Sequence, residues 1–256
     1  MSIVLNEYEW AEQMIKRREL GNKPSETLTR IAKYYLENKY SKSEIREKLD
    51  AFIAVCNTSL TASTLNKIIE NVMSKLGKYP IVQLDSITVY RAELAKIDAL
   101  PGKQIRRLAF TLLCVAKYKD LISPSNNHWA TSKDKDIMQM ANINTSIRRQ
   151  SLLFAQLRDH GLIRFSKMID NLNVQVTFIE DDGETALYIH DFRNLGYQYL
   201  QYCGEPYFTC VNCGLTVKEQ TPSKGRRQKY CPHCAVEIHT KQKVESVMRS
   251  RRLARH

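Results

Sequence analysis

Glycine is scarce in this chain of 256 residues, which contains only nine. No stretch has the spacing of a phosphate-binding loop, neither Gly-x-x-x-x-Gly-Lys-Ser nor Gly-x-Gly-x-x-Gly. The six histidines are scattered, and no nucleophile stands beside a base in the way that covalent catalysis needs. The sequence therefore predicts a binding protein and not an enzyme. A nucleic-acid-processing enzyme remains the least supported alternative.

Long apolar runs are also missing. The longest, residues 108–116, is too short to cross a bilayer. The first thirteen residues carry three Glu and no basic leader, so we expect no secretory signal. Seven cysteines, an odd number, favour a reducing compartment. We therefore expect a soluble cytoplasmic protein without membrane contacts.

Four of the seven cysteines form two Cys-x-x-Cys pairs separated by seventeen residues: Cys210, Cys213, Cys231 and Cys234. Gly214 and Pro232 suit the tight turns that such pairs need. Four thiolates would close a tetrahedron around one Zn²⁺ and leave no position for water, so the metal would be structural. His233 or His239 could replace a cysteine, but the four cysteines are the simplest ligand set. The alternative is four unligated or disulfide-bonded cysteines.

Positive charge is concentrated at the C-terminal end. The formal net charge is +12, and residues 218–256 hold eleven Lys and Arg against three Glu, a charge of +8. A polyanion is the natural partner of such a region, and in a soluble protein that polyanion is usually nucleic acid. The alternative is a solvated charged surface that binds nothing specific.

The fold class predicted by the hydrophobic periodicity is mainly α, of the α+β type. Residues 1–78 have four helical stripes, separated by Gly21-Asn22-Lys23-Pro24, by the stretch before Ser41 and by Asn57-Thr58-Ser59, and form a helical domain. Ser25 is the expected cap of the second helix. Residues 79–103 follow as a connecting strand and helix.

Residues 104–192 show a more informative order of elements. A long apolar helix is followed by a shorter one capped by Ser132, by the turn Asn142-Ile143-Asn144 and by a third helix capped by Thr145 or Ser146. The third helix has the inward stripe Ile147, Leu153, Phe154 and Leu157. Strands 162–168, 174–179 and 185–189 complete a predicted β-meander, with a hairpin turn at Asp181-Asp182-Gly183.

The segment 137–163 contains Met140-Ala141-Asn142 and the exit Leu157-Arg158-Asp159-His160-Gly161-Leu162-Ile163, and it resembles the winged-helix DNA-binding superfamily, which would place a winged helix over residues 104–192. The resemblance implies that the third helix enters a major groove, with base or phosphate contacts near its start and at the wing. The residues expected there are Thr145, Ser146, Arg148, Arg149, Gln150 and Lys167. The whole chain also resembles accessory DNA-binding proteins of phages and mobile elements, which implies gene control or replication, in the cell that hosts such an element.

The remaining segments are an aromatic linker, residues 193–208, a zinc ribbon, residues 209–235, and a basic tail, residues 236–256. The linker should hold a helix over residues 194–202 that packs on the winged helix, although its tyrosines could instead stack on single-stranded nucleic acid. Phosphate contacts are expected from Lys224, Arg226, Arg227 and Lys229 in the ribbon and from Lys241, Lys243, Arg249, Arg251 and Arg252 in the tail.

Double-stranded DNA is thus the first predicted partner. The alternative is an interaction protein that binds a host protein or a nucleoprotein complex, because many winged helices serve protein contacts.

Overall fold

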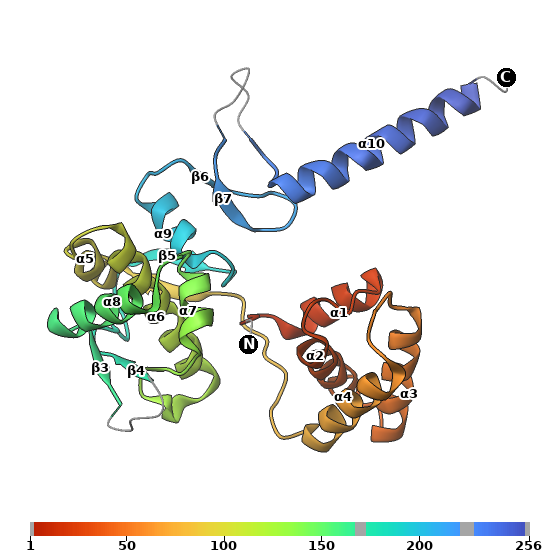
Figure 1. The fold of residues 1–256 in the computed structure, drawn as a ribbon, viewed down its shortest axis with the longest axis horizontal. Helices are drawn as coiled ribbons and strands as arrows, with labels where there is room; N and C mark the ends of the chain where they lie inside the picture. Colours follow the sequence, from red (N-terminus) through yellow and green to blue (C-terminus); the bar gives the residue numbers. More distant parts are fainter. Residues whose placement is uncertain (1–2, 167–172, 221–227, 254–256) are drawn as a thin grey trace. The chain divides into compact units, whose positions relative to one another are not determined.

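The computed structural model describes residues 3–166, 173–220 and 228–253, without the side chains of residues 250–253. The chain divides into two compact units, residues 1–86 and 87–256, each of which is described by itself (Figure 1). The fold is mainly α with small sheets, as predicted. In the described ranges, no helix combines the length and the apolar composition that crossing a membrane requires.

The first unit contains the four predicted helices: α1 (Glu7–Arg17), α2 (Pro24–Glu37), α3 (Lys42–Val55) and α4 (Ala62–Lys75). Helix α2 contacts the other three and supplies the centre of the core. Ser41 and Glu44 cap α3 reciprocally, which satisfies two amides at its start. The predicted cap at Ser25 is wrong, because Pro24 already occupies the first turn of α2 and Lys23 stands at the capping position.

A buried carboxylate joins the segment after α4 to this unit. Glu7 accepts hydrogen bonds from Arg30 Nε at 3.3 Å, Lys33 Nζ at 2.9 Å and the Val82 amide at 3.1 Å. The Glu7 amide in turn donates to the Val82 carbonyl. Residues 79–86 therefore pack with α1 and α2, and the aromatic residues Trp10, Tyr34, Tyr35 and Tyr40 of the unit contact its core.

The second unit is built around α6 (Lys103–Ile122), whose apolar residues are mostly buried. Helices α5 (Arg91–Asp98), α7 (Asp134–Met140), α8 (Ile147–Asp159) and α9 (Leu195–Tyr202) all contact α6. A short 3-10 helix, Pro124–Asn126, ends the α6 segment. The predicted cap Ser132 is wrong by one residue, because Lys133 stands before α7 and makes no side-chain cap.

A three-stranded antiparallel sheet lies in this unit, with the order β2 (Trp129–Ala130), β4 (Val174–Val176) and β3 (Ile163–Phe165). Its register pairs Ile163 with Val176 and Phe165 with Val174. The elements therefore follow the order α6, β2, α7, α8, β3, β4, which is the predicted helical order with the unpredicted strand β2 added. The wing is predicted between the strands 162–168 and 174–179, and its tip, including Lys167, lies outside the described residues.

The predicted third strand of the meander is wrong in its partner. Strand β5 (Thr185–Ile189) pairs with β1 (Ile87–Tyr90), and the two form a separate sheet. Buried Ile87, Val89 and Ile189 explain the choice, because this pairing removes three apolar side chains from water. The stretch Asp181-Asp182-Gly183 consequently leads into β5 and is not the turn of a hairpin.

The carboxylate of Glu93 fixes this corner of the unit although it is fully buried. It accepts from Lys117 Nζ at 2.7 and 2.9 Å, from the Tyr90 amide at 2.8 Å and from the Glu180 amide at 3.0 Å. The Lys117 ammonium also lies 4.2 Å from the centre of the Tyr90 ring. The charge of Glu93 is thus paired and joins α5, α6 and the chain before β5.

The C-terminal part consists of β6 (Tyr207–Thr209), β7 (Thr216–Lys218) and α10 (Pro232–Leu253). The predicted linker helix is confirmed as α9, and its buried Tyr199 lies 5.4 Å from Phe110 of α6, ring centre to ring centre. Tyr199 also donates to Asp98 at 2.5 Å. The main aromatic anchor of the linker therefore packs inside the unit.

Replacing Glu93 with Ala should strongly destabilise the second unit, because it leaves the largely buried ammonium of Lys117 without its counter-ion. We expect a loss of about 3–5 kcal/mol in the free energy of unfolding. Urea unfolding of a Trp10→Phe background, followed by the fluorescence of Trp129, reports on this unit alone. Lys96→Ala is the matched control: it breaks only the exposed pair with Glu180 and should cost about 0–1 kcal/mol. Equal losses in the two variants would contradict this account.

Candidate metal centre and the exposed start of helix α8

The two cysteine pairs meet at one point in the C-terminal part. Cys210 and Cys213 lie between β6 and β7, while Cys231 precedes α10 and Cys234 lies in its first turn. The first pair is folded by local hydrogen bonds, from the Gly214 amide to the Cys210 carbonyl and from the Cys210 amide to the Leu215 carbonyl. Gly214 has a φ of 73°, a left-handed conformation that glycine adopts without strain.

The sulfur geometry fits a tetrahedral metal ion. All four Sγ atoms lie within 4.8 Å of one another, and those of Cys213 and Cys231 are 3.8 Å apart. A zinc ion with bonds of about 2.3 Å requires sulfurs about 3.8 Å apart along each edge of its tetrahedron. A disulfide would need about 2.05 Å, and the four cysteines are free thiols. The distances between the sulfurs therefore fit a bound metal ion and not a disulfide bond.

The electrostatics of the four cysteines also favour a bound cation. Burial opposes the Cys210 thiolate, but donation by the amides of Cys231, Asn212 and Cys213 prevails and lowers its pKa to about 6. Burial and the hydrogen bonds to the other three sulfurs raise the pKa of Cys213 to about 12. Four sulfurs this close cannot all ionise without a compensating charge. A bound divalent cation would supply that charge and hold all four as thiolates.

Two side chains support the cluster from outside. The Asn212 amide donates to Cys234 Sγ at 3.3 Å. Arg193, which is paired with Asp191, donates to the carbonyl of Cys213. This bond connects the first cysteine pair to the chain before α9. Such partners orient the ligands of a metal site. His233 lies in a second group with Cys234 and Glu237, but that group is mostly exposed and contains one thiol only.

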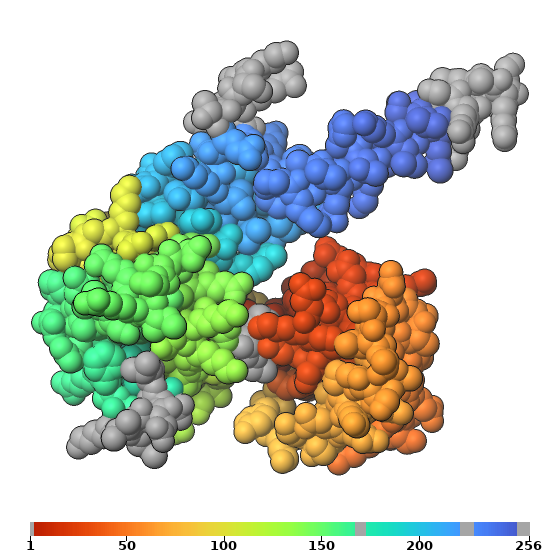
Figure 2. All heavy atoms as spheres, in the orientation of Figure 1, coloured from red at the N-terminus to blue at the C-terminus, as the bar shows by residue number. Residues whose placement is uncertain are grey.

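The predicted nucleic-acid residues lie in three separate places. Thr145, Ser146, Arg148, Arg149 and Gln150 gather at the start of α8, where Ser146 caps the helix as predicted. Lys229 lies just before the second cysteine pair, and Lys241, Lys243 and Arg249 are exposed along α10, whose side chains Figure 2 shows as blue spheres. Lys224, Arg226 and Arg227 lie outside the described residues, and so do the side chains of Arg251 and Arg252.

The inward stripe predicted for α8 needs one correction. Leu153, Phe154 and Leu157 are buried, but Ile147 is 81% exposed. Ile147 is the first residue of α8, and the inward position of that turn is taken by Gln150, whose amide donates to the Thr145 carbonyl at 3.0 Å. The first turn thus extends past the apolar core, and Gln150 is half-buried and occupied with its own backbone.

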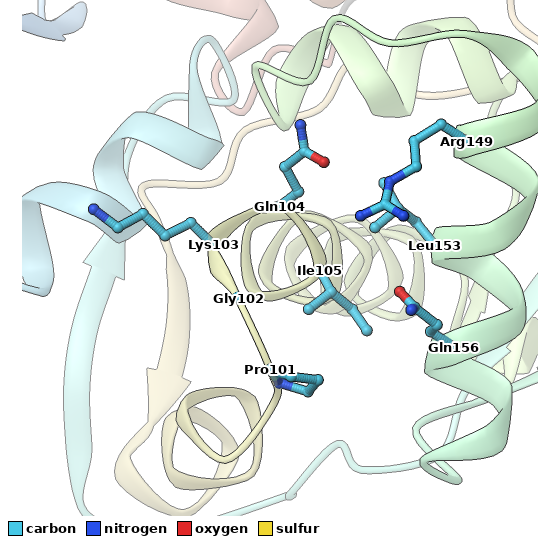
Figure 3. Close-up of a pocket in the computed structure, with 8 residues that line it drawn as sticks. All are labelled: Pro101, Gly102, Lys103, Gln104, Ile105, Arg149, Leu153 and Gln156. Carbon is cyan, nitrogen blue, oxygen red and sulfur yellow. The ribbon is translucent and has the colours of Figure 1, made fainter.

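The two arginines at the start of α8 are exposed and, within the described ranges, neither forms an ion pair. Figure 3 shows Arg149 and Gln156 facing the first turn of α6 across a cleft of about 220 Å³, which Pro101, Lys103 and Leu153 also line. Arg148 lies on the opposite side of α8 from Leu157, because a separation of nine positions makes about two and a half turns. Arg148 therefore points away from the core.

A hydrogen-bonded connection, which the sequence did not indicate, joins the α7–α8 turn to the cysteine domain. Asn142 has a left-handed backbone, with φ at 55°, and its amide donates to Asn194 Oδ1 at 2.9 Å. The Asn194 amide donates to the Thr216 carbonyl of β7, also at 2.9 Å. The Asn142 carbonyl accepts from Arg107 of α6. Only the asparagine-rich turn was a signal in the sequence, and its distant partners could not be read from it.

One family model matches part of the chain. Residues 205–250 match the RNHCP domain, and the match contains both cysteine pairs. No curated protein and no solved structure matches the chain. The family match and the sulfur geometry coincide, so the C-terminal part is a Cys-rich metal-binding domain. Its four cysteines form a site for one structural zinc, as predicted.

Cys231→Ser should remove the zinc and unfold the region from β6 to the start of α10, because structural zinc contributes an apparent ~10–16 kcal/mol to the folding of such modules. Zinc content per chain, measured by elemental mass spectrometry, should fall from one to near zero, while unfolding of the first unit stays unchanged. Cys203→Ser is the matched control, because Cys203 lies outside the cluster. A Cys231→Ser protein that still holds one zinc per chain would refute the ligand set.

Gly196→Ala should disrupt the contact between α9 and the α7–α8 turn. An added Cβ would lie 2.0 Å from the carbonyl oxygen of Ala141 and 3.1 Å from the Arg107 side chain, so the helix must shift. We expect a loss of more than about 2 kcal/mol in unfolding free energy, in the range of overpacked sites. Gly204→Ala meets nothing within 4 Å and carries only the strain of its φ of 79°, about 1–2 kcal/mol. An equal or smaller loss in Gly196→Ala than in this control would contradict the close approach.

Proposed function

We propose that this chain binds double-stranded DNA, with a winged helix over α6 to β4 reading the duplex and the zinc-stabilised C-terminal part contacting phosphates. We further propose a regulatory or replication accessory role in a phage or mobile element and no catalytic role. The last point is supported by the acidic stretch before β5, where Glu180 pairs with Lys96 at 2.6 Å and Glu184 with Arg91 at 2.7 Å. These carboxylates are engaged in ion pairs and poorly placed to hold a catalytic metal.

The observation that carries the proposal is that Arg148 and Arg149, at the exposed start of α8, form no ion pair with any residue in the described ranges. A helix-turn-helix protein places the first residues of its second helix against base edges in the major groove. The order α6, β2, α7, α8, β3, β4, with α7 and the Asn142 turn directly before α8, supports the proposal of such a motif here. Arginine is also the residue that most often recognises guanine, through two parallel hydrogen bonds.

Helix α10 supports the same partner through its charge. Lys241, Lys243 and Arg249 are exposed and form no ion pair with a carboxylate among the described residues. The metal cluster fixes the first turn of the helix, so the cations project from an ordered base. Phosphate contacts of this kind add affinity without sequence preference and release counter-ions.

A protein partner is the second candidate. Exposed apolar side chains occur on α10 beside the cations, with Val236, Val244, Val247 and Met248 between 49% and 67% exposed. An apolar strip on a helix without packing partners is the usual form of a helix that docks in a groove. A single stoichiometric partner that survives nuclease digestion during purification would favour this function over DNA binding.

Affinity for duplex DNA should fall steeply with salt. If Lys241, Lys243 and Arg249 each neutralise one phosphate, replacing all three with Gln should reduce the slope of log K against log salt by about 2.7, at about 0.9 per contact. Fluorescence anisotropy of a labelled 20-base-pair duplex, titrated between 50 and 200 mM salt, measures the slope.

The charge-matched control replaces Lys42, Lys67 and Lys75, three exposed lysines of the first unit, with Gln. This variant changes the net charge equally and should leave the slope nearly unchanged. The proposed function fails if the unaltered protein shows no salt-dependent binding to duplex DNA. Equal effects of the two triple variants would exclude α10 as the phosphate contact.

A further inference from the structure

Ile147 is an apolar residue whose side chain is largely exposed to solvent. Its side chain is 81% exposed, the largest value among the large apolar side chains in the described part of the chain. It stands at the first position of α8, directly beside Arg148. Leu152, on the same helix, is 49% exposed. Single exposed apolar residues are ordinary, but two beside an unpaired arginine at a helix start form a specific pattern.

The positions of these side chains follow from helical geometry. Leu152 comes four residues after Arg148, so the two lie next to each other on one face. Ile147 lies one residue before Arg148, about 100° around the helix axis on its other side. The guanidinium is therefore flanked by an apolar side chain on each side. Gln150 does not belong to this surface, because it is half-buried and bonded to the Thr145 carbonyl.

Base edges in the major groove offer both kinds of group that this surface needs. Guanine presents two acceptors for an arginine, and thymine presents a 5-methyl group for apolar contact. The charge of Arg148 and Arg149 favours a polyanion over a neutral protein groove, and a groove of DNA brings methyl groups and acceptors within one helix width. The observations thus select duplex DNA as the occupant of this face.

We infer that Ile147 and Leu152 are specificity-determining residues that contact thymine methyl groups on either side of a guanine bound by Arg148. This inference rests on the proposed function and narrows it. The preferred site contains a guanine with thymine in a neighbouring base pair. Thr145 and Gln150, although the sequence predicts that they contact nucleic acid, shape the start of α8 and do not select bases.

The test removes the methyl group from the DNA and the side chain from the protein in turn. The full-length protein first selects its best duplexes from a randomised 20-base-pair pool. The selected duplex is then compared with versions in which single thymines are replaced by deoxyuridine, which lacks only the 5-methyl group. At one position or more, the unaltered protein should lose about fourfold in affinity, the contribution of one buried methyl-sized group.

The same replacement should have no effect on Ile147→Ala, or on Leu152→Ala for the other methyl group. Ile147→Val, which keeps two methyl groups near the backbone, should retain part of the effect. Arg148→Ala should reduce the preference for guanine by about 5- to 150-fold. Leu121→Ala is the matched control, because Leu121 is 55% exposed at the far end of α6 and should change neither selection nor methyl sensitivity.

The outcomes distinguish a failure of the inference from a failure of the function on which it rests. A pool selected without base preference, or a uridine effect that persists unchanged in both Ile147→Ala and Leu152→Ala, overturns the inference while duplex binding still stands. A protein that binds no duplex in a salt-dependent manner overturns both. Coincident loss of methyl sensitivity in the DNA variant and the protein variant supports the inference.

Discussion

The arrangement of the second unit depends on the hydrogen bonds of Asn142. The left-handed backbone of this residue turns the chain from α7 into α8, its backbone carbonyl accepts from Arg107 of α6, and its side-chain amide donates to Asn194 at the start of α9. Asn194 in turn holds the Thr216 carbonyl of the cysteine domain. One residue, Asn142, thus connects the turn before α8 with α6 and α9, and Asn194 extends the connection to β7. This network is partly buried, so each unmade bond would leave a partly desolvated polar group, which favours a single geometry.

The cysteine domain that holds the metal site also contacts α9 and the chain before it. The cysteine cluster determines the path of the chain from Cys210 to Gly214, and β7 follows at once with the carbonyl that Asn194 holds. Arg193 pairs with Asp191 and donates to the Cys213 carbonyl in the first cysteine pair. Tyr197 packs on Tyr207 with ring centres 4.8 Å apart. Loss of metal would therefore remove order from the contacts that meet α9. A structural zinc here has consequences beyond its own loop, since α9 also abuts the turn that begins α8.

How much the sequence could predict depended on the range of the interaction. The cysteine site was predictable because two short motifs and one ion suffice, and the helices because their periodicity is local. The pairing of β5 with β1 was not, since it joins Ile189 to Ile87 and follows from shared burial. Ile147 fits the inward period of α8, yet the core ends before it, and periodicity carries no information on where a core ends. The Asn142–Asn194 bond joins two loops whose approach only the packing of α9 on α6 decides.

If the protein binds DNA as proposed, affinity and selectivity would come from different surfaces, because each has different physical requirements. Cations on α10 would attract phosphates through a long-range field, and they would need only an ordered base, which a bound metal would provide at the first turn of the helix. Reading a base requires a side chain held to within a fraction of an ångström, and flexible chains cannot supply that precision at low entropic cost. The start of α8 meets the requirement, because Ser146 caps it, Gln150 bonds the Thr145 carbonyl below it and the Asn142 turn fixes its direction. Residues that bond inward at this helix start are therefore what allow Arg148 and Ile147 to face outward in one defined orientation.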